Sequence, residues 1–189
     1  EPLGTGREKA GGHIESDFIP GDKAAYRERF VSWLPRASAS GLTGVFDAWA
    51  GAPSEEEAYE IWHSLSESGD LSLRVFGSVR ENDAADRVAA KFKRFEQTYS
   101  SQLIRPEAIK LAADGVPEGH TAFLLTSYVD STNEDFGQPM ISKANLTANV
   151  TTYFSQDIPV HIHAIGGAAV RMSLDAIESA RGSTGNDSV

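Results

Sequence analysis

Two histidines, His161 and His163, alternate within an apolar run that is typical of a buried strand. Residues i and i+2 of a strand point to the same face, so the two imidazoles are expected side by side. A Gly-Gly pair at 166–167 and a helical pattern over 168–181 follow, which places the histidines near the carboxyl end of the strand. In α/β barrels that end carries the chemistry. Imidazoles there can bind a metal or act as general bases, although two hydrogen-bonded core histidines would leave the same pattern.

The composition excludes several classes of function. The 189 residues carry a formal net charge of −10, whereas nucleic acids and anionic membrane surfaces attract a basic face. The chain has no cysteine, which excludes disulfides, zinc–thiolate sites and cysteine nucleophiles. No apolar run approaches the roughly 20 residues that cross a bilayer. We therefore expect no nucleic-acid partner and no membrane partner. The sequence leaves the compartment unknown, with the cytoplasm as the default expectation.

Apolar strands and amphipathic helices alternate along the chain. Residues 1–21 are rich in Gly, Pro and charge and predict an irregular leader, and residues 182–189 predict a flexible tail. Between them the hydrophobic periodicity predicts strands at 42–48, 71–79, 108–113 and 158–164. It predicts helices at about 22–40, 54–68, from 82 or 83 onward, 142–155 and 168–181, with a long loop at 116–141.

This alternation predicts an α/β protein built from βαβ units with a parallel sheet. Two architectures fit the pattern: an open doubly wound sheet, and part, about half, of a TIM barrel, which needs eight strands and roughly 250 residues. No Gly-rich phosphate fingerprint follows the first strand, which disfavours dinucleotide binding. An open flavodoxin-like sheet that binds a small anionic ligand has only the alternation in its favour.

Four segments resemble the metal-dependent amidohydrolases of the type that includes N-substituted formamide deformylase (amidohydrolase family 3). Segment 41–48 (GLTGVFDA) is similar to the family's G-[IV]-T-x-V-x-D-A strand, and segment 73–75 (LRV) to part of its next strand. Segment 109–122 (IKLAADGVPEGHTA) resembles a pattern that begins [IV]-K-x-x-x-D-G. Segment 161–170 (HIHAIGGAAV), with LDAIE at 174–178, resembles H-x-H-A-I-G-D-x-A-V. The order and spacing match from about residue 10 to 181.

The resemblance implies a TIM barrel with one or two divalent ions at its carboxyl face, with residues 22–181 forming a partial barrel that contains strands two to five. His163 would match the metal-binding histidine of strand five. Lys110 would match the strand-four lysine, which is carboxylated in many relatives and bridges two metals. An ammonium has no lone pair for a cation, whereas its carbamate behaves as a carboxylate. The residues alone also fit a Lys110 that simply pairs with Asp114. The metal in the full-length parent is expected to be zinc.

Several neighbours of these positions are candidate site residues. His161 shares the strand face of His163, and Asp114 could support a metal site from just behind its ligands, although a turn also favours Asp-Gly. His120 and Thr121 lie in the long loop, where they would contact substrate or hold the loop in place.

The resemblance is incomplete. The sequence has no counterpart of the family's first-strand His-x-His, of its strand-six histidine or of its strand-eight aspartate, and its Gly-Asp pair is Gly166-Gly167 here. At most two of the expected ligands, Lys110 and His163, are therefore present, whereas a catalytic zinc site has three protein ligands. We expect hydrolysis by this isolated polypeptide to fail.

The sequence is compatible with two functions. The first is a segment of a metal-dependent amidohydrolase that hydrolyses a C–N bond of a small amide-type substrate, other than a peptide bond, through a metal-activated water. The alternative is a truncated, non-catalytic relative that acts as a binding or regulatory protein. Its expected partner is a second copy of the chain or the missing half of the barrel.

Overall fold

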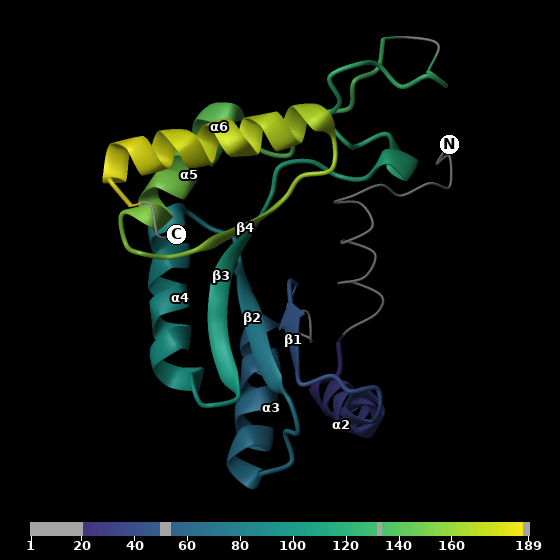
Figure 1. Ribbon diagram of the computed structural model, residues 1–189, viewed down its shortest axis with the longest axis vertical. Coiled ribbons are helices and arrows are strands. Elements are labelled where there is room, and N and C mark those ends of the chain that lie inside the picture. Colours follow the sequence, from purple (N-terminus) through teal and green to yellow (C-terminus); the bar gives the residue numbers. More distant parts are fainter. Residues whose placement is uncertain (1–20, 50–53, 132–133, 187–189) are drawn as a thin grey trace. The chain divides into compact units, whose positions relative to one another are not determined.

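The computed structural model describes residues 21–49, 54–131 and 134–186. Its elements are, in chain order, α2 (Lys23–Ala39), β1 (Gly44–Asp47), α3 (Glu55–Ser68), β2 (Arg74–Arg80), α4 (Ala85–Tyr99), β3 (Ile104–Ala112), the 3₁₀ turn η1 (Pro117–Gly119), α5 (Lys143–Phe154), β4 (Val160–His163) and α6 (Gly167–Thr184) (Figure 1). The chain divides into two compact units, one within 1–80 and 90–107 and the other within 81–89 and 108–189. The predicted leader lies outside the described residues except for Gly21.

The sheet contains the four strands in the order β1-β2-β3-β4. β1 pairs with β2 in parallel with Gly44 opposite Arg74, and β3 pairs with β4 in parallel with Lys110 opposite His161. Because helices connect the successive parallel strands, each strand–helix step is a β/α unit. The predicted α/β class and the partial TIM barrel are confirmed.

The first unit is held by a helix that approaches its sheet closely. Gly77 of β2 leaves room for the Tyr59 hydroxyl of α3, and any side chain at Gly77 would collide with it. The Oγ of Ser54 accepts the amide of Glu57 at 3.2 Å and thereby caps α3, as the sequence predicts. The carboxylate of Glu55 is 6% exposed and accepts a bond from Lys91 at 2.7 Å. The capping residue and this ion pair fix the start of α3.

The start of α5 agrees with the prediction, whereas the start of β3 and the end of α6 differ from it. Ser142 caps α5 as expected, because its Oγ accepts the amide of Asn145 at 3.2 Å. β3 begins at Ile104, four residues before the predicted start, although it contains Pro106. α6 continues to Thr184, so residues 182–184 are helical, and residues 187–189 of the predicted tail lie outside the described residues.

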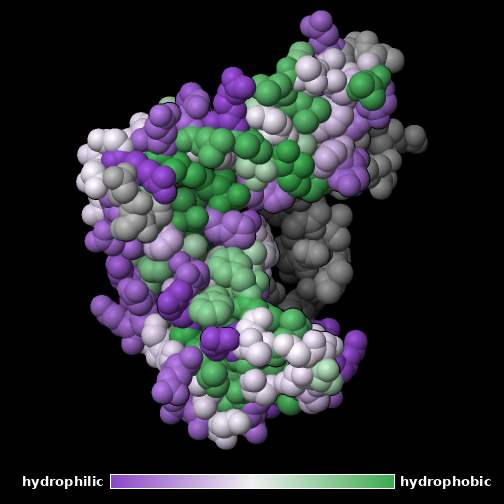
Figure 2. Space-filling view, in the orientation of Figure 1, coloured by the Kyte–Doolittle hydropathy of each residue, from purple (hydrophilic) through white to green (hydrophobic). Residues whose placement is uncertain are grey.

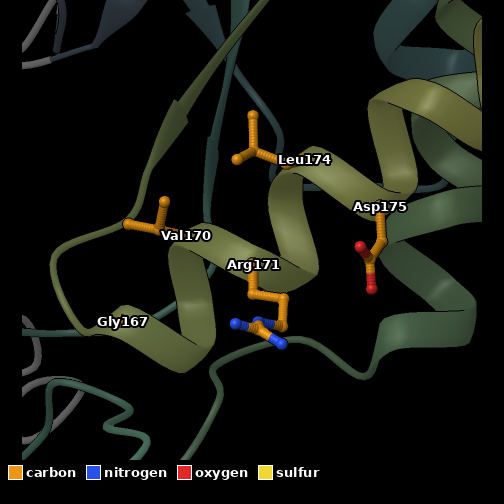
Figure 3. Close-up of a pocket in the computed structure, with 5 residues that line it drawn as sticks. All are labelled: Gly167, Val170, Arg171, Leu174 and Asp175. Atoms are coloured by element: carbon orange, nitrogen blue, oxygen red, sulfur yellow. The ribbon is translucent and has the colours of Figure 1, made fainter.

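α6 lies along α5 (Figure 1) and presents a second apolar stripe to solvent. Met172 and Ala176 are buried, whereas Val170 is 40% and Leu174 is 61% exposed. Apolar side chains are visible along this helix in the space-filling view (Figure 2). Val170 and Leu174 border a shallow pocket of about 240 Å³ (Figure 3). Val170 and Leu174 of α6 are therefore exposed apolar side chains that the described residues leave uncovered. No helix among the described residues is long and apolar enough to cross a membrane.

Two substitutions on α6 test this description of its faces. Met172→Ala should lower the free energy of unfolding by about 2–5 kcal/mol, because it leaves a cavity under the helix. Leu174→Ala should change it by less than about 0.5 kcal/mol, because the side chain already contacts water. Urea unfolding followed by circular dichroism measures both. An equally large loss for Leu174→Ala would show that this side chain is covered in solution.

Candidate functional site

A buried lysine faces a histidine across two neighbouring strands. Lys110 on β3 is 8% exposed, and its Nζ lies 3.3 Å from Nε2 of His161 on β4. The ion pairs formed by the described residues do not include Lys110. Burial lowers the pKa of Lys110. Burial, and then the nearby Lys110 and His163, lower the pKa of His161. Both shifts oppose protonation of the two groups at the same time, and the Nε2 lone pair of an uncharged His161 can accept a bond from Nζ.

His163 makes a different contact. Its Nε2 lies 3.1 Å from the carbonyl oxygen of Gly115. Since a carbonyl can only accept a hydrogen bond, Nε2 must carry the proton and donate it. In a neutral ring the lone pair is then on Nδ1. Histidines that bind metals are typically fixed in this way, with one ring nitrogen bonded to a carbonyl and the other left for the ion.

Asp114 follows β3 and bonds to backbone amides of the long loop and of the turn after β4. Its side chain is 1% exposed. Oδ2 accepts the amides of Phe123 and Gly166, each at 2.8 Å, and Oδ1 accepts the amide of Ile165 at 3.0 Å. The possibility that Lys110 pairs with Asp114 is therefore wrong, because the carboxylate is occupied by three N–H groups from the loop and from the turn after β4.

The turn after β4 approaches the long loop closely. A side chain at Gly166 would collide with the carbonyl of Phe123. The same carbonyl accepts the first amides of α6, from Ala168 at 3.1 Å and from Ala169 at 3.2 Å. Gly167 stands where the resembled family has an aspartate, and the start of α6 has no side-chain cap. A backbone carbonyl of the loop satisfies these helix amides instead.

His120 and Thr121 make their observed contacts within the long loop. The His120 ring stacks on Tyr128 with centroids 4.3 Å apart. Its Nε2 lies 3.1 Å from Asp130 and its Nδ1 lies 3.4 Å from Asp135. The Oγ1 of Thr121 accepts the amide of Val116 at 2.9 Å. These bonds hold the loop in place, and contact of either residue with substrate stays a prediction.

One polar group in this unit was not predicted from the local sequence. Glu81 follows β2, and its amide donates to the carbonyl of Lys110 at 2.9 Å. One of its carboxylate oxygens accepts bonds from Tyr153 and from Asn149, both at 2.8 Å. Burial raises the pKa of Glu81, and the bonds from Tyr153 and Asn149 partly oppose this rise. The partners lie about 70 positions away in the sequence, so no local pattern could have identified them.

The unmodified side chains provide too few metal ligands. In the part of the chain that the structure describes, no three His, Asp or Glu side chains lie together so that they could hold a metal ion. Lys110, His161 and His163 come from neighbouring strands at the carboxyl end of the sheet. If Lys110 carried a carbamate, the three residues would offer one oxygen ligand and two nitrogen ligands, the number that a catalytic divalent site needs.

Comparisons with known proteins agree with this fold. A model described as the amidohydrolase family matches residues 1–189. The chain is similar to the crystal structure of an uncharacterized metal-dependent hydrolase from Pyrococcus furiosus, with 22% identity and a TM-score of 0.68 over 92% of this chain and 35% of that one. It is also similar to one from Pyrococcus horikoshii OT3, with 20% identity and a TM-score of 0.68 over 92% of this chain and 34% of that one. No curated protein sequence matches with significance.

Glu81→Gln tests the raised pKa of this carboxyl. A group whose pKa is higher in the folded state stabilises the fold fully below its ordinary value, and this contribution is lost as the pH rises through the folded pKa. Glutamine keeps the accepting oxygen for Tyr153 and Asn149 but cannot ionise. The variant should therefore gain stability relative to the wild type between about pH 4 and pH 8. Urea unfolding across this range measures the difference, and parallel curves would contradict the prediction.

Proposed function

This chain belongs to the amidohydrolase family, and on that premise we propose that it supplies part of the metal site of a hydrolase that cleaves C–N bonds. The substrate would be a small amide-type molecule, and the bond would not be a peptide bond. The chain spans about a third of the length of the two archaeal hydrolases that it matches. The proposal therefore concerns the complete hydrolase to which such a segment contributes.

The buried Lys110 is the observation that carries this proposal. A buried ammonium without an acidic partner is costly, and the described residues place an imidazole rather than a carboxylate beside it. The cost disappears if the amine is neutral, and a neutral amine can react with carbon dioxide. Its lone pair attacks the carbon of CO₂, and the proton leaves the nitrogen as the carbamate forms. His161 lies within reach to accept that proton.

A divalent cation would be held by the carbamate of Lys110 and by Nδ1 of His163, with His161 as a further nitrogen ligand. Zinc suits this mixture of oxygen and imidazole donors. When bound, such an ion polarises a carbonyl and lowers the pKa of a water molecule to near neutrality. The chain's own contribution is to hold the ligands: Gly115 orients the His163 ring, and β3 and β4 set the spacing of Lys110 and His161.

Further β/α units are the partner that we propose for this segment. β4 is the last strand in the sheet order, and α6, which follows it, exposes Val170 and Leu174. In a closed barrel each edge strand pairs with another strand, and each outer helix packs beside the next. An added strand at β4 and a helix on the outer face of α6 would cover both. They would also bring the remaining ligands of the metal site.

Two observations favour a second candidate function. Gly167 replaces the family's aspartate, and the unmodified His, Asp and Glu residues that the structure describes hold no group fit for a metal. A relative that has lost catalysis and serves as a binding or regulatory protein, as a homodimer for instance, would show these features. Metal analysis separates the two functions, because the second predicts a protein that takes up no zinc even in bicarbonate buffer.

The proposed function predicts metal uptake by the 189-residue chain. In bicarbonate buffer it should bind Zn²⁺ by calorimetry, and His163→Ala should weaken this binding at least about tenfold, since it removes a ligand. His63→Ala is the matched control, because His63 lies on α3 in the first unit. Equal affinities of the wild type and His163→Ala would overturn the assignment.

The proposed function also predicts that Lys110 is modified. Incubation with ¹³C-bicarbonate and Zn²⁺ should give a carbamate resonance that Lys110→Arg abolishes, because a guanidinium does not form a carbamate under these conditions. Lys143→Arg should keep the signal. Lys143 is exposed and paired with Asp175, so its replacement leaves the site intact. A signal that survives in Lys110→Arg would exclude Lys110 as the modified residue.

A further inference from the structure

We propose that Asp114 is a positioning residue, which fixes the ring of His163 by holding both ends of its hydrogen bond to Gly115. This inference rests on the proposed function in so far as it treats His163 as a metal ligand. The sequence places Asp114 in an Asp-Gly pair at the end of β3, where a turn would be sufficient reason for it. The structure gives it a more demanding environment.

A carboxylate is buried at Asp114. The Asp114 side chain is 1% exposed, and the ion pairs among the described residues do not include it. Three backbone N–H groups at 2.8, 2.8 and 3.0 Å compensate the carboxylate instead. Bonds from neutral donors to a buried carboxylate are short and strong, and the loss of one leaves a buried charge under-compensated. The three amides are therefore held tightly in place.

These amides lie in the turn after β4 and in the long loop. Two of them belong to Ile165 and Gly166, which begin two residues after His163, and the third belongs to Phe123 of the long loop. Gly115, whose carbonyl accepts the His163 ring bond, directly follows Asp114. The Asp114 carboxylate thus fixes the segment after His163, which carries the donor ring, and Gly115, the residue next to Asp114, carries the acceptor. A displacement of Asp114 would move donor and acceptor relative to each other.

Backbone contacts on two sides of Asp114 restrict its position. The turn at Gly166 touches the carbonyl of Phe123 so closely that a β-carbon cannot be added. The amide of Ala113 also donates to the carbonyl of His163 at 2.8 Å, which ties the end of β3 to the end of β4. With backbone contacts on both sides, the position of the Asp114 carboxylate decides whether Nε2 of His163 meets Gly115. That bond in turn decides which ring nitrogen carries the lone pair.

Asp114→Asn tests this role, because it keeps the size of the side chain. It replaces one accepting oxygen by an NH₂ group, which faces an amide donor in either orientation of the side chain. We expect the ¹⁵N spectrum of His163 to change from a single Nε2–H tautomer to a mixture of tautomers. We also expect Zn²⁺ affinity in bicarbonate buffer to fall about 10- to 100-fold, as is typical when a residue that orients a metal ligand is lost.

Glu55→Gln is the matched control. Glu55 is the other buried carboxylate among the described residues, but it lies in the first unit and bonds to Lys91. Its replacement should lower stability while leaving the His163 tautomer and the Zn²⁺ affinity unchanged. If Glu55→Gln changes them as much as Asp114→Asn does, the effect is general destabilisation and the proposal is wrong.

Measurements on the wild type and on the metal-free variants also test the role of Asp114. If Asp114→Asn does not fold, the wild type itself is measured: the amides of Phe123, Ile165 and Gly166 should exchange slowly with deuterium, and His163 should be the Nε2–H tautomer. Fast exchange or the other tautomer would overturn the proposal. If the wild type binds no Zn²⁺, the proposed function fails. The tautomer of His163 in the metal-free variants still tests the role of Asp114.

Discussion

A buried carboxylate that three backbone amides compensate, with no ion pair to it among the described residues, is the constraint on which the second unit depends. Asp114 is inaccessible to water, and its charge is tolerated because three N–H groups converge on it. Those groups come from two segments that are about 40 residues apart in the sequence, so the loop and the turn after β4 must meet at one place. The closeness of Gly166 to Phe123, the bonding of the first α6 amides and the setting of His163 all follow from that meeting.

The pairing of Lys110 with His161 is understandable in the same terms. Two nitrogen bases in a poorly hydrated place cannot both be protonated without repulsion, and burial lowers the pKa of each. A neutral lysine is the form that can accept a carboxyl group, and the modified side chain would turn a repelled cation into a metal ligand. Under the proposed function, a buried amine that is costly for stability would serve the metal site of the complete hydrolase.

The family and the fold also account for what this segment leaves uncovered. The chain matches about a third of each archaeal structure, and α6 keeps an apolar stripe at the surface beside the stripe that packs on α5. Apolar side chains with these exposures are tolerated at small cost in solution, but in a barrel they form the contact between neighbouring helices. Under the proposed function, further β/α units would cover this helix face and would add the family's other metal ligands to the three residues of this chain.

Local patterns determined the α/β class, the order of the elements, the caps at Ser54 and Ser142 and the proximity of His161 to His163, because strand and helix periods act over a few residues. The segments around Lys110 and His163 also showed the resemblance to the family. Only the tertiary structure decided that Asp114 bonds to Phe123, Ile165 and Gly166 rather than to Lys110. It also decided that His163 meets Gly115 and that Glu81 meets α5. These partners are 9 to 72 residues apart in the sequence, and the packing of strands, loop and helices decides which distant group meets a side chain.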